Sequence, residues 1–436
     1  MLPGGAAGSG TVGLLRGSGD FRRLYGAVAV SLVGDWFTFV ALSGFVYRRT
    51  GSAGWTALLF AVESLPGVLL MPLVGSLADR RDRRRLRIGC DLASLLPLAG
   101  LLAAFRTGSV PLALGSLAAL SGCAAVAGPV PQAALPNLVT DRQLPYAQTL
   151  LGGVYSAGLL VGAGLGGVVT AAFGTSATLG CDAVSFLLSA WLIARIRGDF
   201  SAEPVGGGGE GAGGGAGAGG GAGHGGRDRG GVAADTVELW RFVRRTPLVG
   251  RLLWLTAGLR LCYGVVGLLP VFALARFQVG AGGVGVMYLA QGVGAVLGPF
   301  LGRRLARGSD GRLLRTGGAA LALFGAGYLL LARAYGLLPG LAAAVLGHVG
   351  VGACAVLALS GLQTATPDRL RGRVMVLAFT LSTALQGVSS LAVAPLAAAF
   401  GPGRAAASIA LGAIGFAAVW SALAAQPRRA DRHPAA

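Results

Sequence analysis

The chain has 436 residues, of which 54% are hydrophobic and only 12% are charged, and its mean hydropathy is +0.69. Soluble domains carry about 25% charged residues, so a water-soluble fold of this length would have too few polar side chains for its surface. The composition therefore excludes a soluble protein and predicts a chain that crosses a membrane many times. The sequence has no lysine, so its 36 positive side chains are all arginine, and with 17 acidic residues they give a formal net charge of +19.

Twelve segments are long and apolar enough to cross a bilayer, which takes about 20 residues in a helix. They cover residues 24–47, 55–77, 88–105, 110–129, 147–170, 174–195, 249–271, 283–302, 314–332, 337–360, 374–397 and 405–425. Several are rich in glycine and alanine, which favours close helix packing in lipid. The sequence therefore predicts an all-α membrane protein with twelve transmembrane helices.

The arginines indicate how these spans are oriented. If residues 1–23 form a cytoplasmic tail, 28 arginines fall on the cytoplasmic side, six fall in the outer loops and two lie within the seventh span. Arginine is strongly enriched on the cytoplasmic side of membrane proteins. We therefore expect both termini, including the tail 426–436, to lie in the cytoplasm beneath the plasma (inner) membrane.

A glycine-rich stretch divides the spans into six and six. Residues 201–232 include GGGGEGAGGGAGAGGGAGHGGRDRGG, which is too poor in apolar side chains to form a core and is typical of a coil. The sequence predicts an N-terminal six-helix bundle over 24–195, a cytoplasmic linker over 196–247 and a C-terminal six-helix bundle over 248–425.

The two bundles look related in sequence. LADRRDRRRLRIG (77–89) aligns without gaps to LARGSDGRLLRTG (305–317), with seven of thirteen positions identical. QAALPN (132–137) follows the fourth span as QTATPD (363–368) follows the tenth. The separation is 228 residues in the first pair and 231 in the second, which favours two parallel repeats with a binding site near the bilayer midplane.

The loop between the second and third spans resembles a signature of the major facilitator superfamily. GSLADRRDRR (75–84) is similar to the pattern G-x-L-a-D-r-x-g-r-[rk] of that family, with Asp82 where glycine is common. GLLVGAGLGG (158–167) in the fifth span resembles the family's antiporter motif, with Ala163 in place of the proline. The glycines that match are Gly158, Gly162, Gly164, Gly166 and Gly167.

Other segments resemble one branch of the superfamily, the macrolide-efflux and siderophore-exporter group. They are FRRLYGAVAVSLVGDW (21–36), PQAALPNLVTDRQLPYAQTL (131–150) and LQTATPDRLRGRVMVL (362–377). The resemblance implies the major facilitator fold, with two pseudo-symmetric six-helix bundles. It also implies that spans 1, 4, 7 and 10 line a central cavity, while spans 3, 6, 9 and 12 are mostly scaffold.

Two carboxylates lie at membrane depth, where ionisable side chains are costly and are functional candidates by default. Asp35 lies midway along the first span, where it either takes up and releases a proton or is hydrogen-bonded at a helix contact. Glu63 lies in the outer half of the second span. It is a second candidate for a proton or a cationic substrate, and the alternative is a structural pair with an arginine near the outer rim.

Arg260 lies at the centre of the seventh span, and a guanidinium stays charged even there. It therefore needs a carboxylate partner or an anionic substrate, and we expect Asp35 or Glu63 to be that partner across the two halves. His348 in the tenth span titrates near neutral pH, although a single histidine in an apolar helix more often only packs. Additional polar groups of the cavity are expected at Tyr155, Tyr263, Gln291 and Gln386.

Two more carboxylates, Asp91 and Asp182, lie on the expected scaffold helices, so a structural role is favoured for both. The sequence has no motif for ATP or metal binding. The chain has no G-x-x-x-x-G-K-[ST] loop for ATP, and its His and Cys residues do not have metal-ligand spacing. We therefore expect no cofactor, no metal and no nucleic-acid partner, and we do not expect an enzyme.

The leading hypothesis is a secondary active transporter that exports a small amphipathic compound, such as a drug, macrolide or siderophore, by proton antiport with rocking-bundle alternating access. Its partners would be the small-molecule substrate, protons and membrane lipids, and it would act as a monomer. A metabolite importer or uniporter is the alternative within transport. A membrane sensor or assembly factor that does not transport is the alternative from another class.

The arginine-rich loop itself is predicted to have two roles. We expect Arg81, Arg85 and Arg87 to do little beyond fixing topology and meeting anionic lipid head groups. The residues that match the family signature would form a cytoplasmic gate, in which Asp79 faces the N-terminal end of the eleventh span and Arg83 pairs with an acid such as Asp141. The predicted gate residues are Gly75, Asp79, Arg80, Arg83 and Arg84.

Overall fold

We describe the chain from a computed structural model. The described residues are 14–15, 17–80, 82–140, 142–198, 200 and 229–425, and of these the side chains at 68, 71–80, 145, 156, 229–236, 368 and 424–425 are not described. All regular elements of the described residues are helical. The N-terminal half contains α2 (Gly19–Thr50), α3 (Ala53–Arg80), α4 (Arg83–Ala93), α5 (Leu95–Thr107), α6 (Val110–Ala127), α7 (Val130–Leu138) and α8 (Leu144–Ala194).

The C-terminal half begins with a helix that lies inside the segment predicted as a linker. This helix is α9 (Arg229–Arg245), and it leads directly into the seventh span, which is built from four consecutive helical pieces. The elements are α10 (Pro247–Cys262), η1 (Tyr263–Leu268), α11 (Leu269–Val271), the π-helix η2 (Phe272–Arg276), α12 (Gly280–Ala306), α13 (Asp310–Arg333), α14 (Leu337–Ala365), α15 (Asp368–Phe400) and α16 (Pro402–Ala425).

The helices account for the twelve predicted spans. Ten helical segments of the described residues are long and apolar enough to cross a membrane. One of them, Tyr146–Ala194, makes two passes, because Gly174 has φ 81° and ψ 171° and breaks the helix in its middle. Helix α3 provides the remaining pass. The predicted all-α fold with twelve spans is therefore confirmed.

The loop predicted between the second and third spans is mostly helical instead. Helix α3 continues to Arg80 and α4 begins at Arg83, because the Asp82 side chain caps α4. Its carboxylate accepts hydrogen bonds from the backbone N–H groups of Arg84 at 2.8 Å and Arg85 at 3.3 Å. Aspartate at this position, where the family pattern has glycine, is thus explained as an N-cap.

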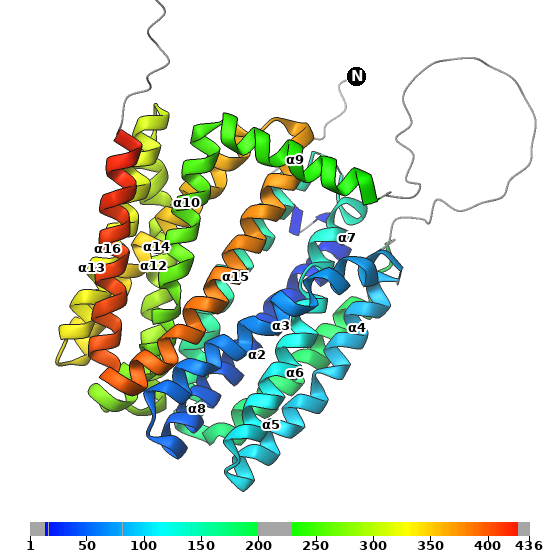
Figure 1. The fold of residues 1–436 in the computed structure, drawn as a ribbon. Coiled ribbons are helices and arrows are strands. Elements are labelled where there is room, and N and C mark those ends of the chain that lie inside the picture. The colour runs from blue at the N-terminus through cyan, green and yellow to red at the C-terminus, as the bar shows by residue number, and fades with distance from the viewer. Residues whose placement is uncertain are drawn as a thin grey trace, which may run out of the picture.

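The two halves form two bundles that lie side by side, with α9 across one end (Figure 1). Within the N-terminal bundle, α2 packs along α8, and within the C-terminal bundle α14 packs against α12 and α13. Between the bundles, α8 packs on α12 and α3 packs on α15. We refer to the end of the molecule that carries α9 as the α9 face.

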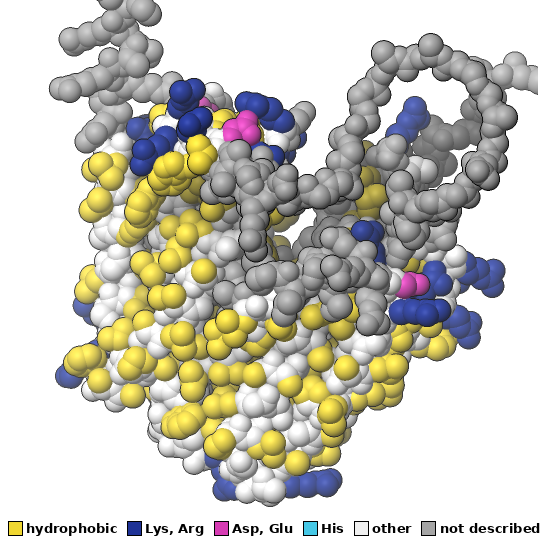
Figure 2. Space-filling view, turned by 45° about the vertical axis from the view of Figure 1, so that its right-hand side comes forward, with side chains coloured by type: hydrophobic (Ala, Val, Ile, Leu, Met, Phe, Trp, Pro, Cys, Tyr) yellow, Lys and Arg dark blue, Asp and Glu magenta, His cyan; other side chains and the backbone are white. Residues whose placement is uncertain are grey.

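Large apolar side chains cover the flank of the molecule, while arginines gather at its ends (Figure 2). Leu96, Phe173, Phe300 and Leu338 are each more than 70% exposed. A soluble protein would bury such residues, whereas in a membrane they face the lipid.

Candidate functional site

A cavity of about 1030 Å³ lies between the two bundles. Helices α2, α3, α6 and α8 form its N-terminal wall, and α10, η1, α12, α14 and α15 form its C-terminal wall. Pockets for drug-sized molecules span roughly 300–1,000 Å³, so the cavity is large enough for such a ligand. It reaches from the middle of the helices toward the α9 face, since Gln363 near the end of α14 and Met375 near the start of α15 both line it.

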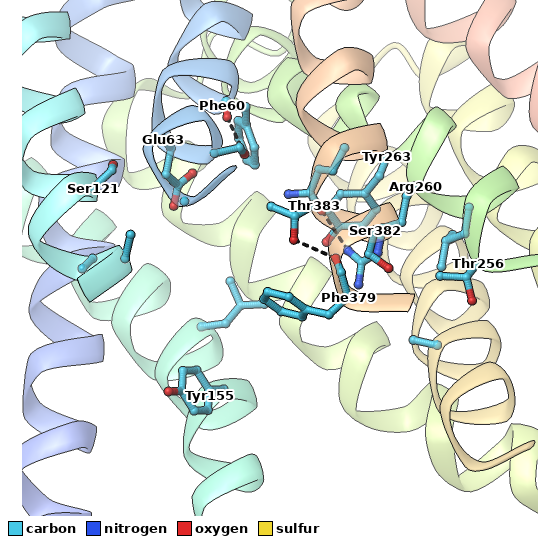
Figure 3. Close-up of a pocket in the computed structure, with 18 of the residues that line it drawn as sticks. Phe60, Glu63, Ser121, Tyr155, Thr256, Arg260, Tyr263, Phe379, Ser382 and Thr383 are labelled. Carbon is cyan, nitrogen blue, oxygen red and sulfur yellow. Dashed lines mark hydrogen bonds between the residues drawn. The ribbon is translucent and has the colours of Figure 1, made fainter. Parts of the chain in front are cut away.

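The N-terminal wall presents two carboxylates to the cavity. Asp35 on α2 and Glu63 on α3 both line it, as does Tyr155 on α8. Figure 3 shows Glu63 across the cavity from the side chains of the other bundle. Around the acids the wall is aromatic, because the ring of Phe39 lies 5.0 Å from that of Phe60, centroid to centroid.

The C-terminal wall presents a cation and neutral hydrogen-bonding groups. Arg260 Nη1 donates to Gln386 Oε1 at 2.8 Å, and the Arg260 guanidinium carbon lies 5.3 Å from the centroid of the Tyr263 ring. Gln291 Nε2 donates to Tyr263 Oη at 3.3 Å. All four side chains line the cavity, so sequence positions from four helical elements meet in one polar group.

The structure does not form the predicted pair between Arg260 and a carboxylate. Among the described residues, no ion pair joins Arg260 to Asp35 or to Glu63, although all three line the same cavity. The guanidinium is instead held by an amide and an aromatic ring of its own bundle. In this conformation the acids and the arginine therefore lie on opposite walls.

His348 lies outside the cavity lining. Its side chain is fully buried, and Nδ1 bonds the Ala344 carbonyl oxygen of the preceding helical turn at 3.0 Å. Its ring centroid lies 6.5 Å from that of Tyr263 and 5.8 Å from that of Tyr328. His348 thus sits one layer behind the C-terminal wall, and a role in transport stays a prediction.

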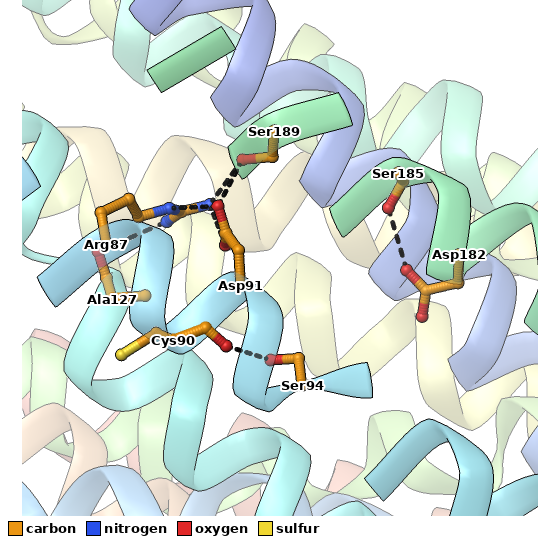
Figure 4. Close-up of polar contacts among 8 residues, drawn as sticks. All are labelled: Arg87, Cys90, Asp91, Ser94, Ala127, Asp182, Ser185 and Ser189. Atoms are coloured by element: carbon orange, nitrogen blue, oxygen red, sulfur yellow. Dashed lines mark hydrogen bonds and ion pairs between the residues drawn. The ribbon is translucent and has the colours of Figure 1, made fainter. Parts of the chain in front are cut away.

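The N-terminal bundle contains a buried ion pair that the sequence interpretation missed. Arg87 Nη2 lies 3.2 Å from Asp91 Oδ1, and Ser189 Oγ donates to Asp91 Oδ2 at 2.7 Å (Figure 4). Arg87 is only 6% exposed. The expectation that Arg87 merely fixes topology and meets lipid is therefore wrong, because α4 begins a turn earlier than predicted and carries this side chain into the bundle.

Asp182 lies in the same bundle, against the back of α2. Its carboxylate accepts hydrogen bonds from Thr38 and, at 3.1 Å, from Ser185 (Figure 4), and its side chain is fully buried. A Cβ atom on Gly34 would lie 2.3 Å from the Asp182 carboxylate, so glycine is needed there. Thr38 also lines the cavity, which places Asp182 one hydrogen bond behind the N-terminal wall.

The predicted gate is described in part. The surroundings of Gly75 and the side chains of Asp79 and Arg80 are not described, and Asp141 lies outside the described residues, so the predicted Arg83–Asp141 pair is not tested. Arg83 Nη1 donates to the Ala133 carbonyl at 3.0 Å, which holds α4 against α7. Arg84 Nη2 donates to the Gly198 carbonyl at 2.7 Å. The gate remains a prediction.

The glycines of the antiporter-like motif line two faces of α8. Gly158, Gly162 and Gly166 lie four residues apart and face α2, where a Cβ on Gly162 would come within 2.8 Å of the Trp36 Cβ. Gly164 and Gly167 face α12 of the other bundle. A Cβ on Gly285 would lie 2.6 Å from the Gly167 Cα, so the two bundles touch backbone to backbone at this point.

We call the contact of Gly167 with Gly285 the glycine seam. A second close approach joins α3 and α15, where a Cβ on Gly54 would lie 2.9 Å from the Ala394 carbonyl oxygen. Both contacts lie on the side of the cavity away from the α9 face. The bundles therefore close one end of the cavity and leave it extended toward the other.

Curated relatives match part of the chain. The multidrug efflux pump Tap of Mycobacterium tuberculosis (strain ATCC 25618 / H37Rv) is 28% identical over 185 residues, which cover 41% of this chain and 44% of the pump. The uncharacterized MFS-type transporter YkuC of Bacillus subtilis (strain 168) is 26% identical over 179 residues, or 41% of this chain and 42% of that one. The chain thus aligns with less than half the length of these relatives.

Solved structures match nearly the whole chain in fold. The POT family transporter PepTSo has a TM-score of 0.67 at 12% identity, covering 93% of this chain and 97% of that one. A bacterial homologue of the iron transporter ferroportin in an inward-facing state has a TM-score of 0.63 at 17% identity, covering 94% and 99%. The family model named Major Facilitator Superfamily matches residues 24–389. The chain, a multi-pass membrane protein with the fold of transporters, therefore belongs to the major facilitator superfamily.

Proposed function

We propose that the chain is a secondary active transporter that exports small amphipathic compounds in exchange for protons. The observation that carries this proposal is the central cavity, with Asp35 and Glu63 on one wall, between two bundles that meet at its far end. Ionisable groups at membrane depth mark substrate and proton pathways. The relative Tap is a multidrug efflux pump, which is consistent with export.

The two acids supply the proton coupling. A carboxylate can hold a proton or pair with a cationic group, but it cannot do both at once. A substrate that carries a basic nitrogen therefore displaces the proton when it binds Asp35 or Glu63, and a returning proton displaces the substrate. Phe60 and Phe379, which line opposite walls, provide apolar surface for the body of an amphipathic molecule.

Alternating access follows from where the bundles touch. The arginine distribution favours a cytoplasmic position for the α9 face, and in that orientation the conformation described would be open toward the cytoplasm and closed toward the outside. Separation of the glycine seam, with closure at the α9 face, would expose the same acids to the other side. The gate predicted around Asp79 and Arg80 would hold that second conformation.

Reconstituted vesicles test the proposal. Proteoliposomes would be loaded with a macrolide, a siderophore or a cationic dye, and efflux would be followed after a pH gradient is imposed. We expect gradient-driven flux of at least one compound, and at least about tenfold less in Asp35→Asn or Glu63→Gln, within the usual range of coupling free energies. Arg303→Gln, which removes an exposed charge on α12, is the matched control.

Two outcomes contradict the proposal. Flux that is independent of the gradient would exclude antiport and favour a uniporter. Accumulation of the compound on the side toward which protons flow would favour an importer.

A further inference from the structure

Arg260 carries a charge that the described residues do not neutralise. Its side chain is partly buried in the cavity wall, and its contacts are the Gln386 amide oxygen and the Tyr263 ring. Its Nε atom is buried and has no hydrogen-bond partner. Removing a charge from water is costly unless a counter-charge and further hydrogen bonds compensate it, so this guanidinium is suited to a negatively charged group from outside the chain.

Further hydrogen-bonding side chains line the cavity near Arg260. Tyr263 follows it by one turn at the start of η1, and both line the cavity. Ser382 and Gln386 lie one turn apart on α15, both line the cavity together with Arg260, and Figure 3 shows Ser382 on the same side of it. Because Gln386 uses its oxygen to hold Arg260, its amide N–H groups are the ones left to face the cavity.

This group of side chains matches the chemistry of an oxyanion. A guanidinium presents planar, paired N–H donors that fit a carboxylate or phosphate, and bonds to a charged acceptor are stronger than neutral ones. The surroundings are apolar, with Phe379 63% exposed and Leu359 50% exposed among the lining residues. The acceptor would therefore be one end of an apolar molecule rather than a free inorganic ion.

We propose that Arg260, with Ser382 and Gln386, binds an oxyanion on the substrate, so that the transported compounds are amphipathic zwitterions. The proposal rests on the proposed function, in which the acids of the N-terminal wall bind the basic group. The two poles of the substrate would bridge the two walls, the amine at Asp35 or Glu63 and the oxyanion at Arg260. A compound with only one pole would engage one bundle.

Equilibrium binding to the detergent-purified full chain tests this without any gradient. Three probes share a naphthalene body: one bears an aminomethyl group and a carboxylate on opposite rings, one bears the aminomethyl group alone and one bears the carboxylate alone. Equilibrium dialysis at one pH gives their affinities. We expect the wild-type chain to bind the zwitterion about tenfold more tightly than the amine, because of one charged hydrogen-bonded contact.

Matched variants assign that preference to Arg260. Arg260→Gln should weaken zwitterion binding about tenfold and change binding of the amine less than twofold, whereas Arg260→Lys should retain part of the preference. Unchanged amine binding also shows that the variant is folded. Arg303→Gln removes one positive charge outside the cavity and should leave all three affinities unchanged.

The proposal is overturned if the wild-type chain does not prefer the zwitterion to the amine, or if Arg260→Gln keeps that preference. Acetate offers the carboxylate without the apolar body, and it should compete at least about tenfold more weakly than the naphthalene carboxylate. Equal competition by acetate would overturn the amphipathic class. Arg260-dependent binding without gradient-driven flux would reject the proposed function and keep this site, and the reverse result would reject the site alone.

Discussion

The two halves differ at a position that their shared sequence pattern makes equivalent. The offset of 228 residues that takes Leu77 to Leu305 also takes Arg87 to Arg315, but it takes Asp91 to Ala319. Arg87 is 6% exposed and paired with its aspartate, whereas Arg315 is exposed. Whether the arginine at this position of the repeat is buried therefore depends on the presence of an aspartate partner and not on its place in the fold.

Residues related by the same offset differ in charge between the two cavity walls. It takes Glu63 to Gln291 and Asp35 to Tyr263, so that an acid in the first half has a neutral group in the second. It also takes Leu32 to Arg260, an apolar residue to a cation. The two bundles share one architecture but have different proposed roles, with proton chemistry on one wall and the oxyanion contact on the other.

The largest expected effect comes from breaking the buried ion pair. Arg87→Gln leaves Asp91 buried without its counter-charge, which costs about 3–5 kcal/mol when one partner of such a pair is removed. Steric-trap unfolding in bicelles measures the free energy of unfolding. The equivalent change Arg315→Gln should alter it by less than about 0.5 kcal/mol. Equal losses at the two positions would refute the difference between the halves.

The next largest effect is expected from a substitution at the glycine seam, where the halves meet. Gly167→Ala introduces a Cβ that would lie 2.7 Å from the Gly285 Cα. Overpacking costs about 1–3 kcal/mol, which here falls on the conformation with the seam closed and corresponds to about a 5–150-fold shift toward the other one. Faster thiol labelling of Ala57→Cys, now 1% exposed and packed against Gly267 of the other bundle, reports the shift in a chain without native cysteines.

Gly180→Ala is the matched control, because nothing lies within 4 Å of a Cβ there. Labelling rates that rise equally in both variants, or in neither, would show that the seam does not set the conformation.

The hidden acid of the N-terminal bundle gives a smaller change. Thr38→Val removes one of the two hydroxyl donors of Asp182, and a buried acceptor that loses a donor costs about 1–3 kcal/mol in the free energy of unfolding. Thr383 in the other bundle bonds only its own helix, to the Phe379 carbonyl at 3.0 Å, among the contacts described. Thr383→Val should therefore change the free energy of unfolding by less than about 0.5 kcal/mol. A larger loss in Thr383→Val than in Thr38→Val would contradict the role of Thr38 as a donor to Asp182.

The smallest effect is expected at the α9 face. Glu238 on α9 pairs with Arg369 at 2.9 Å and Arg373 at 3.1 Å, and all three side chains are substantially exposed. Exposed ion pairs contribute about 0–1 kcal/mol, so Glu238→Gln should lower the thermal midpoint only slightly. At 1 M salt, where the screening length is about 3 Å, the difference should vanish. A loss that persists in salt would indicate packing instead.

The comparison also shows what could be read from the sequence. Long apolar segments gave the spans, because a helix needs about 20 mostly apolar residues to cross a bilayer. Asp35, Glu63 and Arg260 were found because charge at membrane depth stands out, and all three line the cavity. Gln386 and Tyr263 were predicted only as polar groups of the cavity. Their contacts with Arg260 could not be predicted, because Gln386 is 126 residues away in the sequence and Tyr263 lies on a different helical piece.

What could not be read from the sequence depended on helix ends and on packing across long separations. Arg87 was misjudged because nothing in its local sequence shows that Asp82 caps a helix and turns this side chain inward. Thr38 gave no signal as a partner of Asp182, from which it is separated by 144 residues. The absence of an Arg260–carboxylate pair among the described residues depends on how the two bundles face each other, which no residue pattern encodes.

The turn at Gly174 has a mechanical consequence. The Thr170 and Thr178 hydroxyls bond across it at 3.0 Å, so the two arms of α8 are joined with no slack chain between them. Gly167 of the seam lies on one arm, and Asp182 on the other. We therefore expect a separation of the bundles at the seam to move the arm that carries Asp182 as well, and with it the contact of Asp182 with Thr38 behind the cavity wall.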